Sequence, residues 1–159
     1  MQLVVSIADQ HLRLMDEKGG VLAIYAVSTA LNGPSEIKDS GGTPRGHHII
    51  RARIGAGQPL AAVFKGRRPT GEIWSPQLAA QFPQRDWILT RILWLSGCEV
   101  GVNRLGQCDT MQRYIYIHGT PDVEPMGIPL SHGCIRMRNV DVIELFDLVA
   151  TGTRVLIVE

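Results

Sequence analysis

Long apolar runs and runs of like charge are both missing from this chain of 159 residues. No stretch approaches the roughly 20 apolar residues that a membrane-spanning helix requires, so we expect no membrane insertion. The 16 Lys and Arg residues balance 15 Asp and Glu residues and are scattered along the chain. A nucleic-acid partner is not expected either, because such partners are recognised by clustered positive charge.

Cysteine is scarce, and its three positions are Cys98, Cys108 and Cys134. Three thiols cannot build a small-domain disulfide framework, and the odd number leaves at least one of them free. We expect Cys98 and Cys108 to be buried free thiols, with a bridge across a hairpin as the alternative. Because no C-x-x-C or H-E-x-x-H motif is present, the sequence predicts no metal centre and no cofactor.

The first 20 residues lack the features of a secretory signal. Such a signal has a basic start, an uninterrupted apolar stretch and a small-residue cleavage site. Here Asp9, His11 and Arg13 interrupt the apolar residues soon after the start. We therefore expect a cytoplasmic protein, or a periplasmic or extracellular one if a leader has been removed.

Short alternating segments rich in β-branched residues predict a mainly β chain. The expected strands lie at residues 2–8, 11–15, 21–28, 47–54, 87–95, 113–118 and 153–159. Residues 31–46 and 55–86 are rich in Gly and Pro and are expected to be largely irregular. The second of these is long enough to be a lid or a binding surface. Only residues 139–152 predict a confident helix, with Asn139 as its N-cap.

Residues 131–134, Ser-His-Gly-Cys, hold the most reactive side chain of the sequence. A cysteine attacks carbonyls as its thiolate, and an imidazole with a pKa near neutrality is a suitable base. His118 ends an expected strand, where a rigid scaffold can present it to a cleft. The helix start that follows Cys134 is expected to lower the pKa of its thiol, and Gly133 leaves room for a substrate carbonyl. The sequence thus predicts a Cys/His acyl-transfer centre.

The run from His118-Gly-Thr to Ser-His-Gly-Cys-Ile-Arg-Met resembles the signature of the L,D-transpeptidase catalytic domain family, also called the YkuD domain. AVSTA at 26–30 and TPRG at 43–46 extend the resemblance, which covers residues 1–159 as one catalytic domain. The resemblance implies a mainly β, sandwich-like fold with one main helix and long active-site loops. It also implies cleavage of peptidoglycan stem tetrapeptides after their third residue, through an acyl-thioester, with release of D-alanine.

Position by position, the resemblance assigns Cys134 as the nucleophile and His118 as the base that activates it. His132 and Gly133 match the flank of the cysteine, and the amides of Gly133 and Cys134 are expected to face the oxyanion. Gly119 follows the base, and its carbonyl is expected to orient the imidazole.

The resemblance also suggests residues that contact substrate. Arg136 is expected either to hold the motif loop together or to bind a substrate carboxylate. Ser131 is expected to shape that loop through a hydroxyl hydrogen bond. The loop at 121–130, which includes Met126, should border the cleft. Among the tryptophans, Trp74 is the candidate for the cleft.

Several alternatives remain open from the sequence. A thioester can pass to water, as in an L,D-carboxypeptidase that trims recycled muropeptides, or to an amine, as in an exported L,D-transpeptidase that forms cross-links. We expect the first, because no leader is seen, and we expect carbapenem-type β-lactams to acylate Cys134. Other possibilities are a buried structural thiol, a zinc site of His118, His132 and Cys134, and a non-catalytic wall-binding domain. Arg67 and Arg68 are expected to be solvated loop residues, with contact to the carboxylates or phosphates of a muropeptide as the alternative.

Overall fold

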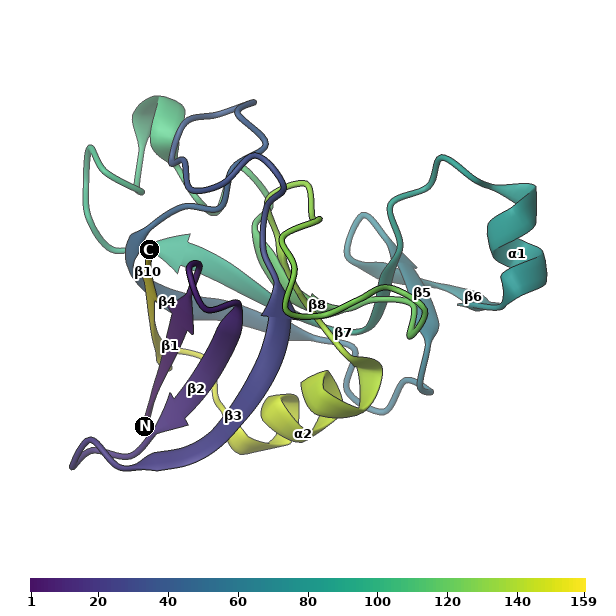
Figure 1. Cartoon of the computed structure of the whole chain (residues 1–159), viewed down its shortest axis with the longest axis horizontal. Coiled ribbons are helices and arrows are strands. Elements are labelled where there is room, and N and C mark those ends of the chain that lie inside the picture. Colours follow the sequence, from purple (N-terminus) through teal and green to yellow (C-terminus); the bar gives the residue numbers. More distant parts are fainter.

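The computed structural model describes residues 1–159, which form a mainly β structure with two α-helices (Figure 1). The strands are β1 (Gln2–Ser6), β2 (His11–Met15), β3 (Val21–Ser28), β4 (Gly46–Ile54), β5 (Ala62–Lys65), β6 (Arg68–Ile73), β7 (Ile88–Gly97), β8 (Tyr116–Gly119), β9 (Ile135–Met137) and β10 (Arg154–Val158). The helices are α1 (Pro76–Gln81) and α2 (Asn139–Leu148), and a short 3-10 helix, η1, spans Gly106–Cys108.

The strands form one sheet that closes on itself. Their order is β4-β10-β1-β2-β3-β9-β8-β7-β5-β6, and β4 also pairs with β7. This additional pairing closes the strands from β4 round to β7 into a ring, while β5 and β6 extend beyond it. The expected mainly β, sandwich-like fold is therefore confirmed as a barrel-like sandwich.

The interior of the ring holds one hydrophobic core of 19 buried residues, to which α2 contributes Val142, Leu145, Phe146 and the adjacent Val149. These helical side chains recur at spacings of three and four residues, so one face of α2 is apolar and packs against β7 and β8. The exposed side of Phe146 is covered by the guanidinium of Arg53, which lies 4.1 Å from the ring centre.

Strands β8 and β9 place consecutive side chains on opposite faces of the sheet. Ile117 and Ile135 are paired across these parallel strands and are buried in the main core. Tyr116 points to the other face, where it joins a second, smaller buried cluster with Phe64 of β5, and Cys134 packs against this cluster. The candidate residues of this face therefore lie between the wall of the ring and the β5–β6 hairpin.

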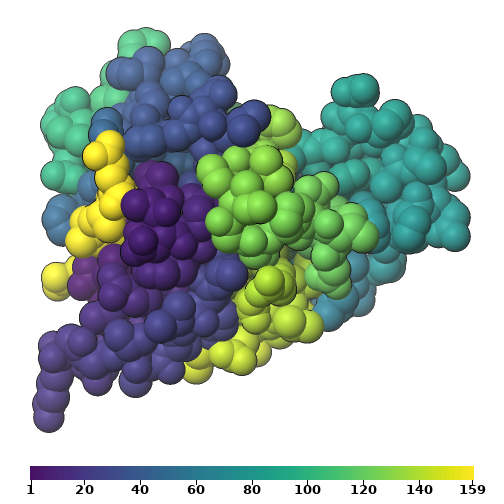
Figure 2. Space-filling model, in the orientation of Figure 1, coloured from purple at the N-terminus to yellow at the C-terminus, as the bar shows by residue number.

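Residues 62–81 form an arm that projects from the ring, shown in teal in Figures 1 and 2. Strand β5 pairs with β7 and with β6, and α1 follows. The hydroxyl of Ser75 caps α1 by accepting a hydrogen bond from the N–H of Leu78 at 3.0 Å. The prediction that 55–86 is largely irregular is thus wrong, because β5, β6 and α1 lie within this segment.

Three further predictions are corrected. The strand expected at 113–118 begins only at Tyr116, because Tyr114 has a φ of +57° and lies in a turn. Helix α2 ends at Leu148, and Asn139 is its first residue instead of its N-cap. Cys98 is exposed and Cys108 is half-buried, although both thiols are free as expected.

None of the helices is both long enough and apolar enough to span a membrane.

Candidate active site

Cys134 lies directly before β9 and beside β8. Its sulfur accepts a hydrogen bond from the N–H of Tyr116 at 3.3 Å, and the thiol donates to the carbonyl of Tyr114 at 3.4 Å. The left-handed φ of +57° at Tyr114 is rare for an aromatic residue. Such backbone strain is concentrated at functional sites. Here it occurs at the residue whose carbonyl accepts the hydrogen bond from the Cys134 thiol.

The environment of Cys134 favours the neutral thiol. Burial raises the pKa of this thiol to about 12, while the Tyr116 N–H and the nearby cations Arg136 and Arg113 act in the opposite direction. The expected lowering by a helix start is wrong, because β9 separates Cys134 from the start of α2. A thiol in this state needs a base at the moment of attack.

His118 lies on the same face of β8 as Tyr116, two residues further along the strand. The imidazole is buried, and its Nδ1 is 2.6 Å from the carbonyl oxygen of Gly119. A carbonyl only accepts hydrogen bonds, so Nδ1 carries the proton and Nε2 presents a free lone pair. Burial lowers the pKa of His118, although the Gly119 carbonyl opposes this. The imidazole is therefore neutral near pH 7 and can accept a proton at Nε2.

Gly119 is enclosed too tightly to carry a side chain. A Cβ atom at this position would lie 2.6 Å from the carbonyl oxygen of Leu89 and 2.5 Å from Oδ1 of Asn139. The same Asn139 amide donates to the carbonyl of Thr120 at 3.0 Å and so connects α2 to the end of β8. The start of α2 therefore supports the backbone that orients His118.

The motif loop is held by two hydroxyl groups. Ser131 Oγ donates to the carbonyl of Cys134 at 2.6 Å and accepts from the N–H of Gly133 at 3.2 Å. Thr43 Oγ1 donates to the carbonyl of Gly133 at 2.9 Å, so the TPRG segment is bonded directly to the motif loop. The Gly133 amide is thus occupied by Ser131, and only the Cys134 amide stays a prediction for the oxyanion.

Asp86, which follows α1, is a site residue that sequence reasoning missed. Its carboxylate accepts a hydrogen bond from Nη2 of Arg136 at 3.2 Å and lies 3.4 Å from Nδ1 of His132. Burial pushes the pKa of Asp86 upward, but the opposing effects of His118, Arg136 and His132 outweigh burial and lower the pKa of the carboxyl. Of the roles expected for Arg136, the contact with Asp86 fits the first, because it connects the segment after α1 to the motif strand β9.

The Cys134 side chain opens into a cleft of about 530 Å³ whose walls include Arg67, Arg113 and Tyr114. A second cavity, of about 280 Å³, is lined by Arg136 and by Thr120, Pro121 and Glu124 of the neighbouring loop. Asp86 and His132 line both cavities, so their contact forms the boundary between the two.

Two expected substrate contacts are absent from these walls. Neither Trp74 nor Met126 lines the cleft or the second cavity. The loop at 121–130 does border the second cavity, but through Pro121 and Glu124, while its backbone at Gly127 is bonded to the carbonyl of Val27. The tryptophan expectation failed because Trp74 lies at the far end of β6.

The zinc alternative gains no support from the geometry. Nowhere in the chain do three or more His, Cys, Asp or Glu side chains gather in an arrangement that could hold a metal ion. His118, His132 and Cys134 are each engaged separately, with Gly119, Asp86 and the backbone of β8.

Comparison with known proteins identifies the family. The L,D-transpeptidase catalytic domain family, YkuD, matches residues 1–157. The chain belongs to this family. Nearly the whole chain is therefore one L,D-transpeptidase catalytic domain, and the chain is an enzyme of this family.

Short stretches of this L,D-transpeptidase domain match curated relatives closely. YkuD of Bacillus subtilis (strain 168) is 56% identical over 41 residues, which are 26% of this chain and 25% of that protein. The Escherichia coli (strain K12) protein named "Probable L,D-transpeptidase YbiS" is 45% identical over 47 residues, or 30% of this chain and 15% of that protein. These alignments span only a fraction of either relative.

Solved structures match over nearly the whole L,D-transpeptidase domain. L,D-transpeptidase 3 from Mycobacterium tuberculosis, in complex with a faropenem-derived adduct, has a TM-score of 0.58 at 15% identity, covering 99% of this chain and 59% of that one. An L,D-transpeptidase from Enterococcus faecium has a TM-score of 0.58 at 17% identity, covering 98% and 48%. The chain spans about half the length of these structures, and at such identities they show the fold alone.

Proposed function

We propose that this chain cleaves the bond between the third residue and D-alanine of peptidoglycan stem tetrapeptides, with Cys134 as nucleophile and water as final acceptor. This is the reaction of an L,D-carboxypeptidase. The observation that carries the proposal is that a neutral Cys134 thiol is hydrogen-bonded to the backbone of β8 at Tyr116, and that a neutral His118, whose Nε2 is free to accept a proton, lies on the same face of β8 as Tyr116.

The first half-reaction follows from these two groups. As substrate enters, the thiol turns away from the Tyr114 carbonyl and passes its proton to Nε2 of His118. The sulfur attacks the carbonyl carbon of the third residue, and the negative oxygen is met by backbone N–H groups, of which Cys134 offers one. The imidazolium then gives its proton to the departing nitrogen of D-alanine, which leaves an acyl-thioester on Cys134.

The second half-reaction returns the enzyme to its resting state. Nε2 of His118 takes a proton from water as the water oxygen attacks the thioester carbonyl. The carbon–sulfur bond then breaks, the proton passes from the imidazolium to the sulfur, and a shortened tripeptide with a free carboxylate leaves. Each proton moved by His118 is thus returned within the same cycle.

The boundary between the two cavities supports water as the acceptor. If the tetrapeptide occupies the larger cleft, the smaller cavity offers an approach for the acceptor, across the contact between Asp86 and His132. Water can cross such a boundary, whereas the amine of a second stem peptide needs the contact to open. Transfer to an amine is the second candidate, because the named relatives are transpeptidases.

The acceptor is tested by incubating the protein with a muropeptide tetrapeptide and following the products by mass spectrometry, with Cys134→Ala as the control. Tripeptide and D-alanine without dimers support the proposal. Cross-linked dimers favour transfer, and equal processing by Cys134→Ala would favour a binding module.

Two further statements belong to the proposal. The chain works in the cytoplasm on recycled muropeptides, which fractionation of cells with a chromosomally tagged protein tests. Carbapenem-type β-lactams acylate Cys134, in line with the imipenem complex and the faropenem-derived adduct described for solved L,D-transpeptidases. A mass increase mapped to the Cys134 peptide tests this.

A further inference from the structure

We propose that Arg67 and Arg113 form a carboxylate-binding site in the cleft of Cys134, which selects acyl donors with a free carboxylate near the bond that is cut. The inference rests on the proposed function, because it names the chemistry of the donor that the thiol attacks. Both guanidinium groups line the same cleft as Cys134, one from the arm and one from the turn before β8.

Arg67 is fixed at the tip of the β5–β6 hairpin. Gly66 and Arg67 form the two-residue loop with φ values of +56° and +63°, as in a type I′ turn. Glycine or asparagine adopts this conformation more easily than arginine, so contacts of the side chain must offset the backbone strain.

Those contacts place the Arg67 guanidinium against the aromatic wall of the cleft. It lies 4.5 Å from the ring centre of Trp94 and 5.0 Å from that of Tyr114. Its Nη1 donates to the hydroxyl of Tyr116 at 3.0 Å, and the N–H of Tyr116 donates to Cys134. The expectation that Arg67 is an ordinary solvated loop residue is therefore wrong.

Arg113 forms the second cation of the site. Its Nη1 donates to the carbonyl of Ser35 at 3.1 Å and its Nη2 to the carbonyl of Gly42 at 2.7 Å, which fixes the guanidinium beside the motif loop. The group is close enough to Cys134 for its charge to lower the pKa of the thiol, against the larger effect of burial.

The charges of the cleft are unequal, and this inequality identifies the ligand. The carboxylate of Asp86 is already in an ion pair with Arg136 and is also in contact with His132. Neither Arg67 nor Arg113 forms an ion pair with any carboxylate of the chain, although Glu36 and Asp39 lie near enough to Arg113 for their charges to raise its pKa against the larger effect of burial. Guanidinium groups bind carboxylates through parallel N–H donors, and five donors per group exceed those used here. Two unmatched cations beside a nucleophile therefore fit an anionic donor.

Two sources of carboxylate exist in the proposed donor. One is the terminal carboxylate of the departing D-alanine, and the other is the side-chain carboxylate of a diamino diacid at the third position. Both lie near the carbonyl that Cys134 attacks, so they share one recognition chemistry.

Alkylation of Cys134 tests the site without relying on any natural substrate. Iodoacetate and iodoacetamide are matched reagents that differ in one carboxylate, and the ratio of their rates at Cys134 is measured by peptide mapping at pH 9. Arg67→Gln is expected to lower this ratio, the rate with iodoacetate over the rate with iodoacetamide, by about three- to tenfold. The reason is the lost attraction between the Arg67 guanidinium and the carboxylate of iodoacetate across the cleft. Arg67→Lys should retain most of it.

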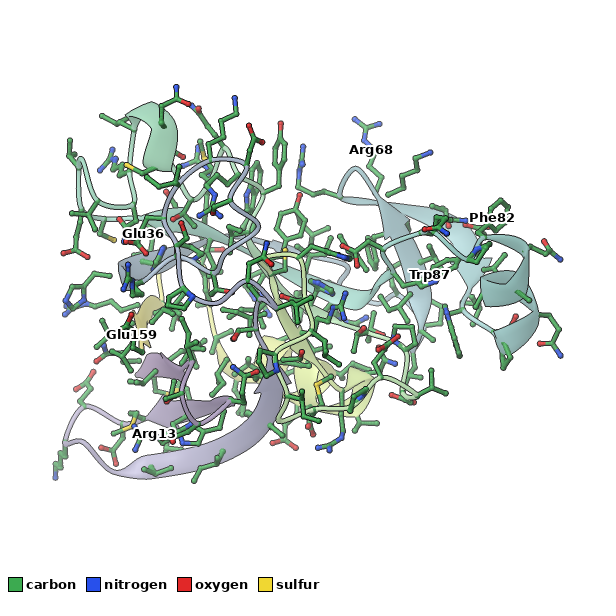
Figure 3. All side chains as sticks on the ribbon, turned by 45° about the horizontal axis from the view of Figure 1, so that its top comes forward. Arg13, Glu36, Arg68, Phe82, Trp87 and Glu159 are labelled. Carbon is green, nitrogen blue, oxygen red and sulfur yellow. The ribbon has the colours of Figure 1, made fainter.

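The matched control is Arg68→Gln, which removes the same charge one residue further on. Arg68 is exposed, does not line the cleft, and projects away from the sheet at the hairpin tip in Figure 3. The ratio at Cys134 should stay at the wild-type value in this variant. A ratio that is equal in wild type, Arg67→Gln and Arg68→Gln overturns the proposal, as does an equal fall in both variants.

Synthetic tetrapeptides then identify the carboxylate. Arg67→Gln should lower kcat/KM at least tenfold for the tetrapeptide whose carboxylates are both unmodified, mainly by raising KM. This difference between Arg67→Gln and wild type should vanish when the carboxylate that Arg67 recognises is amidated. Amidating the terminal and the side-chain carboxylate separately distinguishes the two sources. An equal loss for every donor contradicts the proposal. If wild type cleaves none of the peptides, the proposed function fails, while the alkylation ratio still decides the carboxylate site.

Discussion

The N–H of Tyr116 and the sulfur of Cys134 lie 3.3 Å apart, which fixes the nucleophile against strand β8. A thiolate would strengthen this hydrogen bond, but it would be repelled by the Tyr114 carbonyl that now accepts the thiol proton. Forming the nucleophile therefore requires the sulfur to turn away from the Tyr114 carbonyl and toward His118, which lies on the same face of β8 as Tyr116. Proton transfer and attack are thus coupled to the arrival of substrate.

The resting thiol should react slowly with neutral reagents. Because burial raises the pKa of Cys134 to about 12, little thiolate is present at pH 8. Iodoacetamide should therefore modify exposed Cys98 faster than Cys134, and the rate at Cys134 should still rise above pH 9. Peptide mapping after timed alkylation measures both sites in one sample. A rate at Cys134 that levels off below pH 8 would show a thiolate already formed.

His118 should determine the acid side of the pH–rate profile. The base is active when neutral, and burial lowers its pKa, so kcat/KM should fall only as pH drops below the ordinary histidine value of about 6.5. His118→Gln should reduce acylation about 10²- to 10⁴-fold and abolish this limb. Stopped-flow acylation across pH 4 to 8 measures both effects, and an acid limb with its midpoint above 6.5 would contradict the assignment.

Asp86 should affect both stability and the choice of acceptor. Asp86→Asn removes the charge that faces Arg136 and His132 while keeping the shape of the side chain. Since Asp86 is half exposed, the free energy of unfolding should fall by only about 1 kcal/mol. The boundary between the cavities should open more readily, so the fraction of transfer to an added amine should rise severalfold.

Glu72→Gln provides the control for Asp86→Asn. It breaks a different ion pair, between Glu72 and Arg85 at 3.0 Å, which includes neither Asp86 nor His132. Chemical denaturation and product analysis of both variants separate the two effects. If Asp86→Asn loses stability but gives the same ratio of amine transfer to hydrolysis as Glu72→Gln, the boundary does not control which acceptor is used.

His48 should make the fold sensitive to acid. It is buried between the carbonyl of Gly46 and the hydroxyl of Thr110, and burial lowers its pKa to about 4. As pH falls, the unfolded chain binds the proton first, because its histidine pKa is near 6.5. The contribution of His48 to the free energy of unfolding is therefore complete above pH 6.5 and is lost as pH falls toward 4. The loss amounts to about 3 kcal/mol.

The His48 prediction is measured by urea denaturation at pH 7, 5.5 and 4. His48→Gln should be less dependent on pH than wild type, whereas His47→Gln, at the exposed neighbouring position, should follow wild type. Equal pH dependence in all three proteins would locate the acid sensitivity elsewhere.

Local patterns were enough to predict most of the ring. Strands β1 to β4, β7 and β10 are long or alternate clearly, and their expected positions agree with the structure to within a few residues. Strands β5 and β9 are short, and β6 contains Pro69 and Gly71, so no periodicity marks these three strands. The pairing of β4 with β7, which closes the ring, joins distant segments and has no local signal.

The catalytic pair could be predicted because both residues belong to short motifs, but their surroundings could not. Asp86 and Arg67 reach the cleft only because β5 pairs with β7, the neighbour of β8, which no local pattern indicates. The pKa of Cys134 was predicted in the wrong direction, since burial depends on packing across strands and outweighs the effect of nearby amides.

The most direct test of the central claim is to trap the acyl-enzyme. The protein is mixed with stem tetrapeptide, quenched in acid within the first turnover, digested and analysed by mass spectrometry. The account predicts that the tripeptide acyl group is attached to Cys134 and forms far more slowly in His118→Gln. Release of D-alanine with no acyl group on Cys134, or with the group on Cys98 or Cys108, would contradict it.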